Sequence, residues 1–242
     1  MLYIIFMEIS KYNSPNHNNK PRSNKCITFI VIHYTGMQSE RESLKRLINP
    51  KSKVSCHYLI NRGGKIFKIV KDKYVAWHAG KSKWRKYKNL NKNSIGVELV
   101  NKGHSYGYQN FSKKQINALI KLSKTLKKKY KIKSNSVLGH SDIAPLRKID
   151  PGEKFPWKDL SKKGVCFYPK KDFSKFKNRK SIEIGDFIKN LHQIGYRYLN
   201  KKNKKKLIKN FQRKYRQKLI NGILDEETLK ISEFLARNSN IS

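Results

Sequence analysis

The sequence has few cysteines, few acidic residues and no long apolar run. Its 242 residues include three cysteines, Cys26, Cys56 and Cys166, and none of them stands in a C-x-x-C pattern. An odd number of cysteines without that spacing excludes a disulfide framework and a zinc site built from paired thiolates. No apolar stretch approaches the roughly 20 residues that cross a bilayer, so we expect no transmembrane segment.

A secretory signal is also lacking. The first residues, MLYIIFMEISKYNSP, hold only a short apolar patch with no positive charge before it. Signal sequences carry an apolar region of ~7–15 residues behind a basic segment. No cysteine follows that could carry a lipid. We therefore expect no clear export signal, and we interpret residues 1–24 as an irregular leader.

Negative charge is scarce. The chain has 16 Asp and Glu against 56 Lys and Arg, which gives a formal charge of +40. Such a charge favours polyanionic partners, among them nucleic acid, an acidic membrane face and an anionic wall polymer. The basic residues are spread along the whole chain without a nucleic-acid-reading motif, so we expect no specific nucleic acid partner. Whether the charge is functional or only reflects a composition rich in Lys and Asn stays open.

The apolar patterns predict an α/β domain built around a central mixed β-sheet flanked by helices. Continuous apolar runs at 27–32 and 94–100 predict buried strands, and two β-rich runs around Asn61 to Gly64 predict a hairpin. Ser112 and Gln115 form the pattern of a capping box, which predicts the start of a helix. This domain is expected to cover residues 25–168.

The C-terminal part has a different pattern. Residues 169–180 are basic and pattern-poor, which is typical of a linker. Within 181–242, helical periodicity at 182–194, 204–217 and 225–236 predicts a small three-helix bundle with turns at Gly195 and Gly222.

Two histidines and an aspartate are candidates for a metal site. His33 follows the strand predicted at 27–32, where open α/β sheets place their ligand crevices. His140 and Asp150 lie ten residues apart in the loop GHSDIAPLRKIDPG. Two imidazoles and a carboxylate would supply the three protein ligands of a catalytic zinc. The spacing also fits three solvated loop residues, and at this point both interpretations stay open.

Other residues could carry chemistry beside such a site. Glu98 interrupts an apolar strand, where a carboxylate is costly unless it is paired, functional or turned to solvent. Near a metal it could transfer protons, and Lys148 could stabilise an oxyanion or be one more exposed cation. Trp77 and His78, in VAWHAGKSKW, suit stacking on a sugar or peptide substrate, and packing in the core explains the tryptophans equally well.

Five segments resemble a known enzyme family in their order along the chain. FIVIHYTG, SCHYLI, AWHAGKSKW, NKNSIGVELVN and GHSDIAPLRKIDPGEKFPW resemble the zinc-dependent N-acetylmuramoyl-L-alanine amidases of type 2, the group that contains the AmiD and AmpD amidases. The resemblance implies one zinc per chain, held by His33, His140 and Asp150, with Glu98 and Lys148 as catalytic residues. It further implies hydrolysis of the amide between N-acetylmuramic acid, or its 1,6-anhydro form, and L-alanine of the peptidoglycan stem peptide.

The chain departs from the family pattern at two positions. Val100 stands where many members have a second glutamate, which leaves Glu98 as the candidate base in that strand. Leu146 replaces a small residue and has no functional explanation from the sequence. The C-terminal segments IGDFIKNLHQIGY and IKNFQRKYRQKLINGILDEETL resemble a small three-helix peptidoglycan-binding domain. A helical extension that only supports the amidase domain is the alternative.

The resemblance implies peptidoglycan or muropeptides as partners of a monomeric enzyme. A non-catalytic recognition protein of the same fold is the main alternative, and it predicts an incomplete ligand set. A zinc peptidase is disfavoured because the chain has no H-E-x-x-H segment. The expected substrate indicates the cell envelope or periplasm, and the N-terminus leaves the cytoplasm as the alternative.

Overall fold

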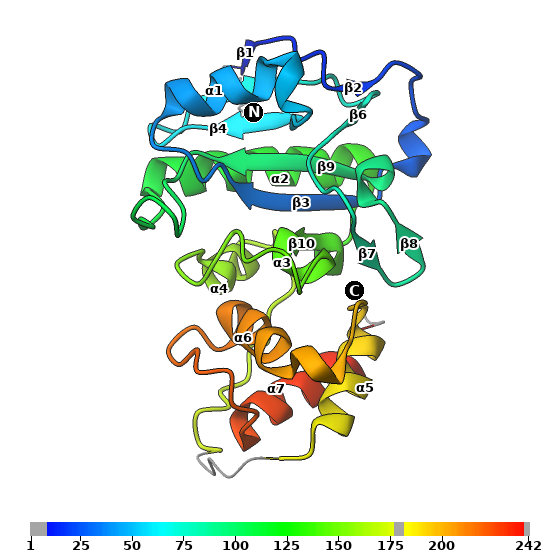
Figure 1. The fold of residues 1–242 in the computed structure, drawn as a ribbon, viewed down its shortest axis with the longest axis vertical. Helices are drawn as coiled ribbons and strands as arrows, with labels where there is room; N and C mark the ends of the chain where they lie inside the picture. The colour runs from blue at the N-terminus through cyan, green and yellow to red at the C-terminus, as the bar shows by residue number, and fades with distance from the viewer. Residues whose placement is uncertain (1–8, 177–181, 240–242) are drawn as a thin grey trace, which may run out of the picture.

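A six-stranded mixed sheet forms the centre of the molecule (Figure 1). The computed structural model describes residues 9–176 and 182–239. The strand order is β1-β5-β4-β9-β3-β10, and every neighbouring pair is parallel except β4 with β5. The strands are β1 (Ile9–Lys11), β5 (Ile66–Lys68), β4 (Tyr58–Ile60), β9 (Ser94–Leu99), β3 (Phe29–Tyr34) and β10 (Val137–Gly139). The predicted α/β architecture with a mixed sheet is confirmed.

Successive side chains along β3 and β9 point to opposite faces of the sheet, so each strand contributes to the apolar core on both faces. Ile30 and Ile32 pack with leucines of α2 (Lys113–Tyr130). Phe29 and Val31 point to the other face and share a cluster with Phe187 and other residues of the C-terminal helices. His33 has the same parity as Phe29 and Val31, so the strand turns its side chain away from α2.

The predicted helices are present, and they flank the sheet as Figure 1 shows. The three C-terminal helices begin and end within two residues of the ranges expected from periodicity, and Gly195 and Gly222 between them have φ angles of 134° and 78°. Asp225 caps α7 by accepting a hydrogen bond from the Thr228 amide. The helices besides α2 are α1 (Glu40–Ile48), α3 (His140–Ile143), α4 (Trp157–Lys162), α5 (Ile184–Ile194), α6 (Lys204–Tyr215) and α7 (Glu226–Arg237).

Two expectations about the ends of the catalytic region need correction. The leader is not irregular throughout, because Ile9–Lys11 forms β1 at the edge of the sheet and His17–Asn18 (β2) pairs with Val75–Ala76 (β6). In the linker, Phe173 is buried and packs against Phe234 of α7. Residues 1–8 of the leader and 177–180 of the linker lie outside the described residues.

One detail of the sequence interpretation is also wrong, and one pair of strands was missed. Ser112 caps α2 as expected, but the Gln115 side chain does not complete a capping box. It donates to the carbonyls of Ile60 and Val100, and so ties α2 to the sheet. The short hairpin of β7 (Lys83–Trp84) with β8 (Tyr87–Lys88) was not predicted from the sequence.

The C-terminal helices share their apolar core with the sheet. One cluster of buried residues joins Val31, Trp84 and Leu138 to Leu191 and Phe211. The backbone amide of Arg85 also donates to Gly195 at 2.7 Å. The bundle is therefore packed against the face of the sheet that carries His33, with no separate core of its own.

Candidate active site

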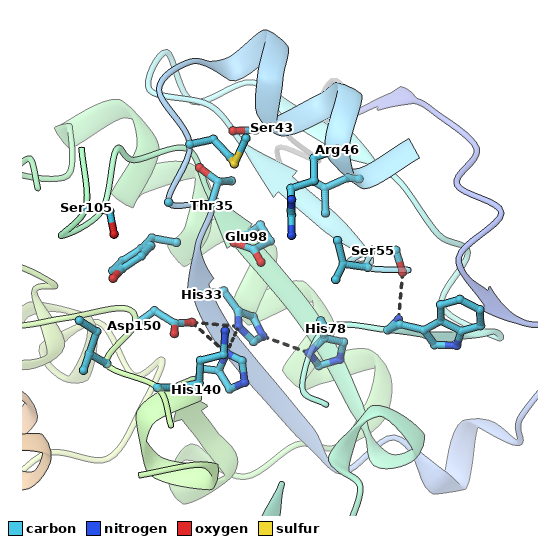
Figure 2. Close-up of a pocket in the computed structure, with 18 of the residues that line it drawn as sticks. His33, Thr35, Ser43, Arg46, Ser55, His78, Glu98, Ser105, His140 and Asp150 are labelled. Carbon is cyan, nitrogen blue, oxygen red and sulfur yellow. Dashed lines mark hydrogen bonds and ion pairs between the residues drawn. The ribbon is translucent and has the colours of Figure 1, made fainter. Parts of the chain in front are cut away.

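His33, His140 and Asp150 meet at one point, and all three are buried (Figure 2). The two Nδ1 atoms lie 3.0 Å apart, and Asp150 Oδ2 lies 3.1 Å from His33 Nδ1 and 3.0 Å from His140 Nδ1. β3 carries His33, and His140 begins α3 directly after β10, the strand paired with β3. Neighbouring parallel strands end at the same edge of a sheet, which explains why the two rings meet.

The remaining ring nitrogens are held by hydrogen bonds that assign the tautomers. The Ser94 hydroxyl donates to the Leu90 carbonyl at 2.6 Å, so it accepts from His78 Nε2 at 3.2 Å. His78 Nδ1 then accepts from His33 Nε2 at 3.0 Å, which leaves His33 Nδ1 without a proton. His140 Nε2 donates to the Ala79 carbonyl at 3.0 Å, which leaves its Nδ1 bare as well.

The charges of the cluster favour metal binding. Burial lowers the pKa of His33 to about 4, and the neighbouring His140 adds to this. Burial by itself raises the pKa of Asp150, but the His140 and His33 rings outweigh it and lower that pKa well below its usual value. Neutral imidazole and ionised carboxylate are the forms that bind a metal. Three bare donor atoms facing one another fit a divalent cation, and two nitrogens with one oxygen suit zinc.

Glu98 lies beside this cluster. In the sheet register it is the direct partner of His33, so both side chains leave the same face at neighbouring positions. Its Oε2 is inaccessible to solvent and has no hydrogen-bond partner among residues 9–176 and 182–239. Burial raises the pKa of Glu98 to about 8, and the charge of Asp150 acts in the same direction, whereas Lys148 and Arg46 oppose it. An unpaired carboxylate of this kind is a candidate proton-transfer group.

A cavity of about 400 Å³ opens over the cluster. The structure brings all seven residues singled out from the sequence to this one cavity. Lys148 is half-buried in its wall, and Leu146 is not among the residues that line it. The seven residues are His33, Trp77, His78, Glu98, His140, Lys148 and Asp150.

Trp77 and His78 occupy different positions relative to the cavity. Trp77 is partly exposed, and its indole nitrogen donates to Asn18 Oδ1 at 2.7 Å. His78 is 9% exposed and uses both ring nitrogens in contacts with His33 and Ser94. This placement suits a residue that orients His33 better than one that stacks on substrate. Trp84 is 3% exposed and packs on Tyr196, so it belongs to the core.

The sequence interpretation missed several residues of the cavity wall. His104 Nδ1 lies 2.9 Å from the Tyr34 hydroxyl and its Nε2 lies 3.1 Å from Glu153 Oε2, and the ring stacks on Tyr108. Arg46 of α1 points into the cavity from the side of Glu98 (Figure 2). Arg46 is one of 56 basic residues and has no local pattern that could have distinguished it. The HYT segment, whose first two residues end β3, was the available signal for Tyr34.

Gly96 keeps His78 in place, and Gly96→Ala is expected to loosen the metal site. A Cβ atom at position 96 would come 2.4 Å from His78 Cγ, so the ring has to move away from His33. We expect destabilisation of about 1–3 kcal/mol from overpacking and roughly 10- to 100-fold weaker zinc binding, because a displaced His78 no longer holds the His33 ring. Thermal unfolding and competition with a zinc chelator measure the two effects. Gly185→Ala is the control, because a Cβ there meets nothing within 4 Å; equal zinc affinity in both variants would contradict the role of His78.

Two histidines and a carboxylate with an unpaired glutamate beside them form the constellation of a metal-dependent hydrolase. The chain belongs to the N-acetylmuramoyl-L-alanine amidase family (Amidase_2), whose profile matches residues 22–153, and it is an enzyme of that class. The family inferred from the sequence motifs is thereby confirmed.

Similar proteins extend the match beyond that region. The chain is 35% identical to N-acetylmuramoyl-L-alanine amidase AmiD of Escherichia coli, over 86% of this chain and 82% of that protein. It is 31% identical to 1,6-anhydro-N-acetylmuramyl-L-alanine amidase AmpD of Haemophilus influenzae, over 63% and 90%. The structure of E. coli AmiD with anhydro-N-acetylmuramic acid-L-Ala-D-gamma-Glu-L-Lys superposes with a TM-score of 0.80 at 33% identity, covering 88% of this chain and 90% of the other. AmpDh3 of Pseudomonas aeruginosa gives a TM-score of 0.79 at 30% identity, covering 93% and 98%.

Proposed function

We propose that this chain hydrolyses the amide bond between the lactyl group of N-acetylmuramic acid, or of its 1,6-anhydro form, and the L-alanine of the stem peptide. One zinc ion per chain would be held by His33, His140 and Asp150. The observation that carries the proposal is the convergence of these three donor atoms at the floor of a cavity beside Glu98. The substrate seen in the AmiD complex and the name of AmpD support muropeptides as the substrate class.

When bound, zinc lowers the pKa of a water molecule and polarises a substrate carbonyl. A nearby divalent cation would favour the ionised form of Glu98 by lowering the raised pKa of its carboxyl group. Ionised Glu98 accepts the proton of the attacking water, and its Oε2 has no other partner in the described residues. It then returns that proton to the departing amine. Lys148 faces the same cavity from the loop that carries His140 and Asp150, and its ammonium group stabilises negative charge on the carbonyl oxygen.

Other protein groups around the site orient the metal ligands and contact the substrate. His78 and the Ala79 carbonyl hold the two imidazoles so that both Nδ1 atoms face Asp150. Trp77 lies at the exposed part of the cavity, where an indole face can support a sugar or peptide. Arg46 can pair with a carboxylate of the stem peptide, since it points into the cavity from α1.

We further propose that residues 25–168 are the catalytic unit and that the helices within 181–242 contact peptidoglycan. The second proposal depends on the resemblance of the helical segments to a peptidoglycan-binding domain. The described residues contain no helix long and apolar enough to cross a bilayer. The substrate class indicates the cell envelope as the place of action, and the cytoplasm is the alternative.

Product analysis with and without a chelator tests the proposed function. The purified protein is incubated with anhydro-muropeptides and, separately, with whole sacculi, and the products are identified by mass. We expect release of stem peptides that begin with L-alanine, abolished by the chelator and restored by zinc. Peptide release that resists prolonged chelation would contradict the metal assignment, and the absence of release from both substrates would overturn the proposal.

A further inference from the structure

Helix α6 contacts the loop that carries His140, Lys148 and Asp150. Between residues 144 and 149 this loop has no helix or strand. Its turn is closed by the amides of Arg147 and Lys148, which both donate to the Ala144 carbonyl at 3.0 Å. Both bonds lie within the turn, so its placement depends on contacts from outside. Arg147 Nη2 donates to the carbonyls of Ala79 and Lys81 at 2.8 and 3.1 Å, and α6 adds a further contact.

Asn210 of α6 supplies that contact. The residue is 3% exposed, and its Nδ2 donates to the carbonyls of both Pro145 and Lys148, the latter at 3.0 Å. Its Oδ1 accepts from Arg213 Nη1 at 2.9 Å, and Arg213 in turn lies 3.4 Å from Glu153. The amide therefore has its donor side fixed toward the loop and its acceptor side toward its own helix.

One turn further along α6, Lys214 holds the other end of the same loop. Its ammonium group lies 2.6 Å from Asp142 Oδ2, in a pair that is almost fully buried. Asp142 also accepts from the Tyr196 hydroxyl at 2.6 Å and from the Gly139 amide at 2.7 Å. Residues 210 and 214 are four apart, so they project from one face of the helix. That face holds the loop at Asp142, two residues after His140, and again at Lys148.

We propose that the C-terminal bundle positions the catalytic loop, with Asn210 as the positioning residue for Lys148. This inference rests on the proposed function for the role of Lys148. Asn210 binds the backbone carbonyl of Lys148, so its effect on the reaction passes through the placement of that side chain. The bundle therefore also affects the rate at which small soluble muropeptides are cleaved. Such substrates are too short to contact both the cavity and a separate wall-binding surface.

Two substitutions at Asn210 and one control separate this role from simple packing. Asn210→Ala removes the side chain, and Asn210→Leu keeps its approximate size but has no donor. Asn190→Ala is the control, because among the described residues the Asn190 amide of α5 bonds within the bundle, to Ser232 Oγ at 3.0 Å. On a soluble anhydro-muropeptide we expect kcat to fall roughly 10- to 100-fold in both Asn210 variants, with KM changed less than about twofold and zinc content unchanged. The control should retain wild-type kcat.

Two kinetic results would contradict the positioning role of Asn210. If Asn210→Leu and Asn190→Ala have the same kcat, Asn210 only fills space and the inference is wrong. If KM rises while kcat is unchanged, the bundle contributes binding and not positioning, which also overturns it.

Hydrogen exchange provides a readout that does not depend on turnover. In the metal-free protein, the Arg147 and Lys148 amides should exchange faster in Asn210→Leu than in wild type, and at the wild-type rate in Asn190→Ala. Unchanged exchange in Asn210→Leu would overturn the inference. If wild type lacks amidase activity, the proposed function fails, while the exchange experiment still decides whether Asn210 holds the loop.

Discussion

Glu98→Ala is expected to lower turnover roughly 10²- to 10⁴-fold, the usual contribution of a positioned proton-transfer group, and to leave the zinc in place. Glu98 is not one of the three converging donors, so its removal keeps the metal site intact. Its Oε2 is buried and has no hydrogen-bond partner in the part of the chain that the structure describes, so this oxygen is free to take the proton. Steady-state kinetics on an anhydro-muropeptide and metal analysis of the same sample measure the two quantities. Full activity of Glu98→Ala would show that another group moves the proton.

Glu98→Gln gives an independent check on the environment of the carboxyl group. The pKa of Glu98 is raised from 4.5 to about 8, so the folded state binds the proton more tightly than the unfolded state. The protonated form contributes stability that is complete below pH 4.5 and is lost as the pH rises through 8. Glutamine stays neutral, so the variant of the metal-free protein should gain stability relative to wild type across that window. Denaturant unfolding at several pH values measures the difference, and a constant difference would mean that Glu98 is solvated.

His140→Ala is expected to lose both the zinc and the activity. It removes one of the three donors and leaves Asp150 with a single imidazole partner. A bound metal supplies several kcal/mol of charge stabilisation, so turnover should fall at least roughly 10³-fold. His192→Ala is the matched control, because His192 is exposed on α5 and should leave metal content and turnover unchanged. Stoichiometric zinc in His140→Ala would contradict the ligand assignment.

Sequence alone predicted the sheet strands of the catalytic region because their apolar runs are local and strong. The apolar runs at 27–32 and 94–100 predict buried strands, and the parallel pairing of these strands in the structure places His33 beside Glu98. The ligand loop was identified through the chemical types of His140 and Asp150 and through the order of the family motifs. The three-residue strand β1 was missed because its pairing with β5 is a contact between distant parts of the chain.

The supporting residues of the site could not be predicted, for a physical reason. Asn210 and Lys214 contact partners 62 to 72 residues away, and two of these contacts are to backbone carbonyls, which have the same chemistry at every position. The role of His78 depends on the space that Gly96 leaves beside β9. Contacts of this kind leave no periodic pattern in the sequence, so only the three-dimensional arrangement shows them.

The apolar cluster shared by the sheet and the C-terminal helices has a thermodynamic consequence. Because Val31 and Leu138 pack in the same cluster as Leu191 and Phe211, exposing either set in isolation costs hydrophobic free energy, so the two parts lose structure cooperatively. A ligand that binds only the native state stabilises the whole cooperative unit. A metal ion held at the edge of the sheet would therefore protect helices that never touch it, and apo protein would melt earlier in both parts at once.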